Sequence, residues 1–105
     1  SKKYSLDYII RKDKINDKGE CPIVLRYTYN RKYYRIPLGY SVGVNDWDDS
    51  NRIPKTSFKS FKVIFSSMME LNRKMELLID NEILKFGIPP SNEKLKLLFM
   101  DILNY

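Results

Sequence analysis

Hydrophobic and polar residues alternate in three segments within the first forty positions. In residues 4–11, apolar or aromatic side chains take every second position, with one lapse at Ile9. A second alternating run follows Pro22, and a third covers residues 32–38. A period of two is typical of strands that bury one face. The sequence therefore predicts three strands within residues 4–38.

The segments between these runs contain turn-forming residues. Asp17, Lys18 and Gly19 separate the first two runs, and glycine adopts positive φ without steric cost. Only Asn30 and Arg31 separate the second run from the third, which predicts a tight hairpin.

The sequence after residue 38 suggests that the chain leaves the sheet. Gly39 and Gly43 are expected to mark this exit, and the composition of residues 50–57 is typical of a loop. The hydrophobic residues between these segments are expected to anchor the exit in the core: Val42, Val44 and Trp47.

From residue 58 onward the hydrophobic period becomes helical. Apolar residues recur at spacings of three and four up to Phe86, and Glu82 is the one charged residue on this stripe. Gly87 is expected to end the helix as its C′ residue. Ser91 is a suitable N-cap for a last, shorter helix. The apolar stripe of this last helix contains Leu95, Leu98, Phe99 and Ile102. We expect it to cover either the long helix or a following domain.

The order of these elements predicts an α+β fold. A three-stranded antiparallel sheet would be backed by a long amphipathic helix, and a short C-terminal helix would follow. We expect one domain over residues 1–87, with the sheet at 4–38 and the long helix at about 58–86. Residues 88–105 would form the short helix that leads to a further domain. Because the helix covers one face of the sheet, the other face would remain open.

The positive charge of the chain is concentrated near its N-terminus. The 105 residues have a net charge of +6, and residues 1–40 carry ten Lys or Arg against four Asp or Glu. The remaining residues carry nine of each, so the whole excess lies in the predicted sheet region. No acidic residue occurs between Cys21 and Tyr40. This asymmetry favours an anionic partner.

Several classes of function lack the residues that they require. The chain has no histidine and one cysteine, Cys21, which excludes a zinc site and the commonest general base. The acidic "DWDD" segment lacks the spacing of a calcium loop, and no glycine motif for phosphate occurs. We therefore expect no enzyme activity, cofactor, metal or small-molecule substrate. No apolar stretch is long enough for a membrane span, and a cytoplasmic location is expected.

Strand alternation divides the segment "RYTYNRKYYR" between two faces. If Ile23, Leu25 and Tyr27 face the helix, then Arg26 and Thr28 face away from it. The outward set in the third strand contains Tyr33 and Arg35. Basic residues at the hairpin tip and after the first strand would extend this surface: Arg31, Lys32, Lys12 and Lys14. A β-ribbon with outward arginines fits the DNA major groove.

Two other readings of this surface stay open. Basic residues can simply keep an exposed sheet face soluble and prevent edge pairing. The domain could also bind an acidic protein partner through the sheet edge or the last helix. Single-stranded RNA is less suitable, because it requires outward aromatic residues for stacking and the register supplies only Tyr33.

Residues 11–49 resemble the N-terminal arm-binding segment of tyrosine recombinases, the phage-type integrases, from Bacteroides-group mobile elements. The resemblance rests on "DKGECPI", "LRYTYNRK" and the later "VNDWD" segment, which begins at Val44. The family often has Asn-Gly at the hairpin where this chain has Asn30 and Arg31.

The resemblance implies sequence-selective binding of double-stranded DNA at arm-type sites, in support of DNA integration and recombination. It implies base or backbone contacts by Arg26, Thr28 and Arg35, supported by Lys12, Lys32 and Tyr33. The catalytic domain of such a recombinase is absent from this chain, and Tyr105 is not expected to act as its nucleophile. Under the alternative reading, the partner would be an acidic protein or another recombinase subunit.

Overall fold

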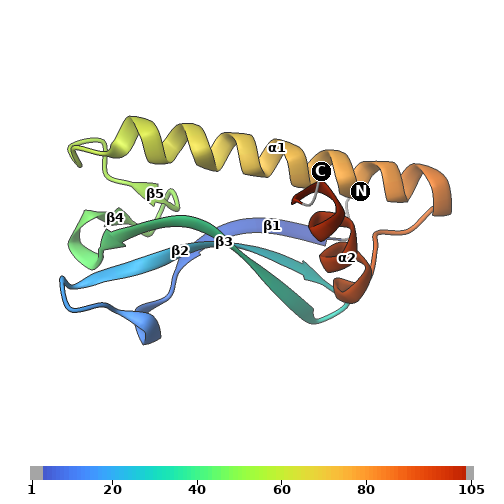
Figure 1. Cartoon of the computed structure of the whole chain (residues 1–105), viewed down its shortest axis with the longest axis horizontal. Helices are drawn as coiled ribbons and strands as arrows, with labels where there is room; N and C mark the ends of the chain where they lie inside the picture. The colour runs from blue at the N-terminus through green and yellow to red at the C-terminus, as the bar shows by residue number, and fades with distance from the viewer. Residues whose placement is uncertain (1–3, 104–105) are drawn as a thin grey trace.

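A three-stranded antiparallel sheet and a long helix form the body of the molecule. In the computed structural model, which describes residues 4–103, the strands are β1 (Tyr4–Ile10), β2 (Glu20–Tyr29) and β3 (Lys32–Gly43), in that spatial order. Helix α1 (Phe61–Phe86) crosses one face of the sheet, and α2 (Asn92–Leu103) lies near the β2–β3 hairpin (Figure 1). The predicted α+β fold, with its backing helix and short last helix, is confirmed.

Short elements fill the connections. A 3₁₀ turn, η1 (Lys12–Lys14), follows β1, and a second, η2 (Val44–Asp46), follows β3. Strands β4 (Trp47–Asp48) and β5 (Ile53–Pro54) then pair with each other in a separate antiparallel ribbon. The segment expected to be a loop therefore contains β5. Of the three expected anchors, Val42 and Trp47 are buried, whereas Val44 is exposed because it begins the 3₁₀ turn.

The core lies between the inner face of the sheet and α1. Every second residue of β2 points toward the helix, and Ile23, Leu25 and Tyr27 are almost completely buried. Two inward tyrosines also satisfy their hydroxyl groups in the core. Tyr8 Oη donates to the carbonyl of Met68 at 2.6 Å, and Tyr27 Oη donates to the carbonyl of Pro90 at 2.7 Å. These bonds tie the sheet to α1 and to the segment before α2.

Helix α1 follows the predicted stripe. Its buried residues are Ile64, Met68, Met75, Ile79 and Glu82. The helix ends as expected at Gly87, which adopts φ 77° and donates its amide to the carbonyl of Ile83 at 2.7 Å. A residue with a Cβ is disfavoured in this left-handed conformation, so glycine fixes the end of the helix.

Strand β3 continues well beyond Leu38, where the sequence suggested that the sheet ends. The continuation pairs with the start of β2, so that Val42 lies opposite Cys21 and Gly43 opposite Glu20. The register shifts between these pairs and the Val24–Pro37 pair, because residues 38–40 of β3 stand opposite a single β2 residue. Gly39 has φ 93° at this bulge. The glycine thus bends the strand and does not end it.

The β2–β3 hairpin turns through Asn30 and Arg31. Both residues have positive φ, 58° and 66°, which is the pattern of a type I′ turn. Asparagine tolerates this conformation, but arginine carries a steric cost there. The predicted hairpin is confirmed, with a turn residue that is poorly suited to it.

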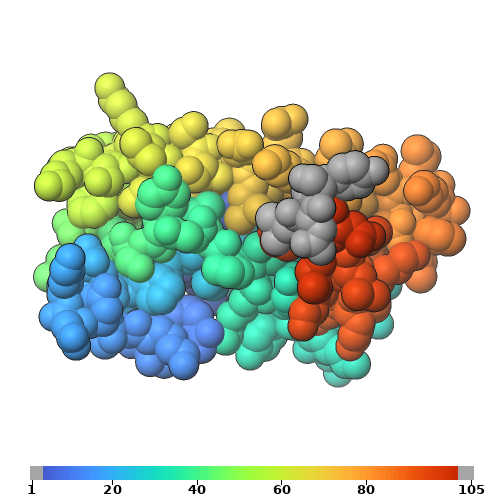
Figure 2. Space-filling model, viewed as in Figure 1, coloured from blue at the N-terminus to red at the C-terminus, as the bar shows by residue number. Residues whose placement is uncertain are grey.

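Helix α2 packs on the domain through its first turn. Ser91 Oγ accepts the amide of Lys94 at 3.1 Å, as expected of an N-cap, and Leu95 is fully buried. Lys94 Nζ forms an ion pair with the buried Glu82 at 2.6 Å and lies over the ring of Phe86. Figure 2 shows α2 filling the space between the C-terminal part of α1 and the hairpin. The side chain of Ile102 lies outside the described residues.

The buried phenol of Tyr8 makes stability depend on pH in the alkaline range. Burial raises the pKa of Tyr8, so the folded protein keeps this proton where the unfolded chain, with a phenol pKa of about 10, releases it. The stability that the protonated Tyr8 phenol contributes is therefore fully present below about pH 10 and is lost as the pH rises above that value. We expect Tyr8→Phe to lower the free energy of unfolding by about 1 kcal/mol at neutral pH and to make the alkaline decline shallower.

Urea unfolding at neutral and alkaline pH measures both effects. Tyr40→Phe is the control, because Tyr40 is exposed and its loss should change neither quantity. An alkaline decline of equal steepness in Tyr8→Phe and wild type would contradict the assignment.

The strained turn predicts a stabilising substitution. Glycine adopts positive φ freely, so Arg31→Gly should raise the free energy of unfolding by about 0.5 to 1 kcal/mol. Arg31→Ala removes the same charge but keeps the Cβ, and it should give no such gain. Equal gains from both variants in urea unfolding would assign the effect to charge rather than to backbone strain.

Candidate nucleic-acid interface

The face of the sheet opposite α1, called the outer face below, carries three cross-strand rows. The strand pairings align Ser5 with Thr28 and Tyr33, Asp7 with Arg26 and Arg35, and Ile9 with Val24 and Pro37. Within residues 4–103 both α-helices pack on the inner side of the sheet or at its hairpin end (Figure 1). The predicted outward residues Arg26, Thr28, Tyr33 and Arg35 therefore share one face.

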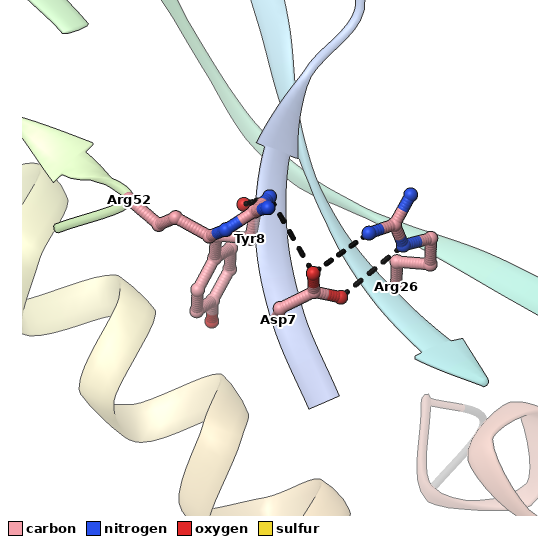
Figure 3. Close-up of polar contacts among 4 residues, drawn as sticks. All are labelled: Asp7, Tyr8, Arg26 and Arg52. Carbon is pink, nitrogen blue, oxygen red and sulfur yellow. Dashed lines mark hydrogen bonds and ion pairs between the residues drawn. The ribbon is translucent and has the colours of Figure 1, made fainter. Parts of the chain in front are cut away.

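Asp7 lies at the centre of an ion-pair cluster on this face (Figure 3). Arg26 donates to its carboxylate twice, from Nε at 3.2 Å and from Nη2 at 2.7 Å. Arg52 Nη1 lies 3.4 Å from the same carboxylate and donates to the carbonyl of Tyr8 at 3.3 Å. The hydrogen bonds to Asp7 are the main reason that the pKa of Arg26 rises above its usual value. Arg26 thus stays charged, with two of its donors already engaged.

Arg35 is held in a different way. Its guanidinium carbon lies 4.9 Å from the centre of the Tyr33 ring, and Nη2 lies 3.4 Å from the Tyr33 hydroxyl oxygen. No carboxylate pairs with Arg35 among the described residues, and its buried Nε–H has no acceptor there. Stacking on tyrosine orients an arginine without neutralising its charge. Arg35 is therefore the outer-face arginine whose charge remains available to a ligand.

A hollow of about 410 Å³ adjoins Arg35 and the end of β1. Lys12 and Arg52 also line it, as do two acids, Asp13 and Asp49. A fourth basic side chain in the lining, Arg11, is paired with Asp13 at 2.7 Å. Lys12 and Arg35 have no acidic partner within the described residues. The hollow therefore offers two unneutralised cations to an anion.

The remaining predicted residues lie at the two ends of the sheet. Arg31 is exposed at the hairpin tip, while Lys14 is exposed in η1 at the opposite end. Lys32 pairs with Tyr29 and lines a small hollow with Glu93, so it lies toward α2. The structure thus brings together the four central residues and Lys12, but it separates the tip from Lys14 by the length of β1.

Asp7, Arg11 and Arg52 also belong to this surface, but they were not predicted from the sequence. Asp7 was visible as an outward position of the first strand, yet its partner depended on the register between β1 and β2. Arg52 reaches the sheet from a turn in which it has φ 57°, a conformation that arginine rarely adopts. The sequence around Arg52 contains no pattern that predicts such a contact.

The acidic "DWDD" segment has a structural role. Asp48 accepts hydrogen bonds from the side chain of Asn51 and from the amides of Ser50 and Asn51. These bonds, the Asn51 side chain first, lower the pKa of Asp48. Among the described residues, His, Cys, Asp and Glu side chains form no group of three that could hold a metal ion. No helix in that part of the chain combines the length and apolar character that a membrane crossing requires.

A β-sheet with an open, basic face and a helix on its other side is an architecture suited to binding DNA. The chain belongs to the family of arm DNA-binding domains, the N-terminal domains of phage-type integrases, whose family model matches residues 8–85. The match covers most of the sheet and nearly all of α1. Neither the curated proteins nor the solved structures contain a match to this chain. The domain is therefore a non-catalytic DNA-binding domain of the integrase type.

Proposed function

We propose that this domain binds double-stranded DNA sequence-selectively at arm-type sites, with the outer face of its sheet in the major groove. The observation that carries the proposal is the state of Arg35. Tyr33 orients its guanidinium, and no carboxylate pairs with it among the described residues. Because stacking on tyrosine leaves the charge of Arg35 intact, the side chain can attract an acceptor on the ligand.

The dimensions of the sheet support this mode of binding. Three strands at spacings of about 4.8 Å make a ribbon about 10 Å across, and the major groove is about 12 Å wide. The six residue steps of β1, from Tyr4 to Ile10, span about 20 Å at about 3.3 Å each. Strands that ran along the groove would thus cover about six base pairs, at about 3.4 Å per base pair.

The residues would then have distinct roles. Arg35 can donate two parallel hydrogen bonds to the O6 and N7 atoms of a guanine, which is the commonest specific contact of arginine. Thr28 and Tyr33, in the neighbouring row, suit phosphate contacts or a thymine methyl group. Lys12 at one end and Arg31 at the other would contact phosphates, with Lys14 and Lys32 as more peripheral charges. Arg26 would contact DNA through the donors that Asp7 leaves free.

Within an integrase of a mobile element, such a domain would hold the protein at arm-type sites during integration and recombination. Strand cleavage would belong to another domain of the recombinase. The Bacteroides-group origin suggested by the sequence stays a prediction.

Salt dependence of binding tests the electrostatic part of the proposal. If the domain neutralises about four to six phosphates, the logarithm of the association constant should fall against the logarithm of salt concentration with a slope near −4 to −5. Fluorescence anisotropy with the element's own end sequences and with scrambled duplex, each at several salt concentrations, measures this slope and the selectivity. A flat salt response, or equal affinity for the two duplexes at every concentration, would refute sequence-selective DNA binding.

Substitution of Arg35 tests the base contact. Arg35→Ala should weaken binding to the preferred duplex by about 1 to 3 kcal/mol and should reduce the preference over scrambled duplex. Lys62→Ala is the matched control, because Lys62 is an exposed cation on α1, the helix that covers the opposite face. Lys62→Ala should change the affinity for either duplex only by the small amount expected from the loss of one charge far from the interface. Equal losses from the two variants would indicate unspecific charge attraction.

A chemical-shift titration separates DNA binding from the alternative protein-interaction role. Addition of a short duplex should shift the amides of residues 26–35 and of η1. Shifts confined to α2, and seen only with an acidic protein partner, would support the alternative.

A further inference from the structure

Two arginines occupy adjacent positions in the central row of the outer face, and one acid completes that row. Arg26 lies between Asp7 on β1 and Arg35 on β3. An acidic side chain at the centre of a surface that binds DNA opposes affinity, because it repels phosphates. Its presence in this row therefore calls for a role other than electrostatic attraction of DNA.

The geometry shows what Asp7 does to Arg26. The carboxylate engages Nε and Nη2 of the guanidinium, in a two-pronged contact at 3.2 and 2.7 Å. Such a pairing fixes the plane of the guanidinium as well as its position. Figure 3 shows the other terminal nitrogen of Arg26 pointing away from Asp7. Arginine has five N–H donors, so this nitrogen still offers donors in a fixed direction.

The cluster is also anchored from the other side. Arg52 contacts the Asp7 carboxylate and the Tyr8 carbonyl, which attaches the β4–β5 turn to the edge of β1. The side chains of Asp7 and Arg26 are about a quarter and a third exposed, so the pair is neither deeply buried nor fully solvated. A ligand on the outer face can therefore reach Arg26 without breaking the pair.

We propose that Asp7 is a positioning residue that sets the sequence selectivity of the outer face by restraining Arg26. An unrestrained arginine binds phosphates of any sequence, because phosphate contacts carry no base information. An arginine whose charge is offset by a carboxylate and whose plane is fixed gains little from a phosphate in an arbitrary position. It gains from an acceptor that lies where its free nitrogen points. This inference rests on the proposed DNA binding and adds the residue that limits binding to wrong sequences.

Asp7→Asn tests this role, because asparagine keeps the size of the side chain and removes its charge. The two probes are a duplex enriched by the wild-type protein from a random-sequence pool and a scrambled version of it. We expect Asp7→Asn to raise affinity for the scrambled duplex about three- to tenfold and for the enriched duplex less than about twofold. The salt slope for the scrambled duplex should become steeper by about one, as expected of one additional phosphate contact.

Asp17→Asn is the charge-matched control. Asp17 lies exposed in the β1–β2 turn and has no ion-pair partner among the described residues, so its loss should raise both affinities by the same factor. The double variant Asp7→Asn with Arg26→Ala assigns the effect to Arg26, and in it the gain on scrambled duplex should disappear. Asp7→Glu retains the charge and should retain most of the selectivity.

Three results would overturn this inference alone. The first is an unchanged ratio of the two affinities in Asp7→Asn. The second is a gain in affinity for the scrambled duplex that persists when Arg26 is also replaced. The third is an equal loss of affinity for both duplexes, together with a lowered thermal midpoint of unfolding. The last result would mean that Asp7 serves only the fold. If the wild-type protein itself showed no preference for the enriched duplex, the proposed function would fail, and this inference would fail with it.

Discussion

The alternation of side chains along the strands governs both the fold and the site. Because successive residues of β2 point to opposite faces, the same ten-residue strand supplies the core with Ile23, Leu25 and Tyr27 and supplies the outer face with Arg26 and Thr28. A shift of one residue in register would bury the arginine and expose the tyrosine. The burial of alternate residues under α1 therefore holds the outer face in place. Under the proposed function, the affinity for DNA would therefore depend on core packing that the DNA does not contact.

The outer face is less uniformly basic than its sequence suggests. The segment from Cys21 to Tyr40 has no acid, yet the strand pairing places Asp7 beside Arg26, and Asp13 pairs with Arg11 at the end of β1. Among the described residues, the surface thus combines neutralised arginines with cations that have no acidic partner, such as Arg35 and Lys12. Such a pattern favours discrimination, because only some of the positive charges respond to phosphates wherever they lie. Total charge alone would describe this surface poorly.

Hydrophobic periodicity predicted those features of the fold that depend on residues close together in the sequence. The inward positions of β2, the stripe of α1, the αL end at Gly87 and the cap at Ser91 all follow from residues near each other in the chain. Contacts that depend on the meeting of distant segments were not accessible in this way. Arg52 reaches Asp7 from a different ribbon, and Lys94 pairs with Glu82 across two helices. Glu82 was recognised as an exception to its stripe, but its partner was not.

The bulge at Gly39 divides β3 into two parts with separate partners. Residues 32–37 pair with the end of β2 that carries Arg26 and Thr28, while residues 41–43 pair with its beginning and lead into η2 and β4. Since the bulge absorbs the difference in length, the register of each part is set independently of the other. A residue gained or lost there during evolution would leave the rows of the outer face aligned. The bulge is thus a place where the β4–β5 ribbon can diverge in length or position while the arrangement of the outer face is preserved.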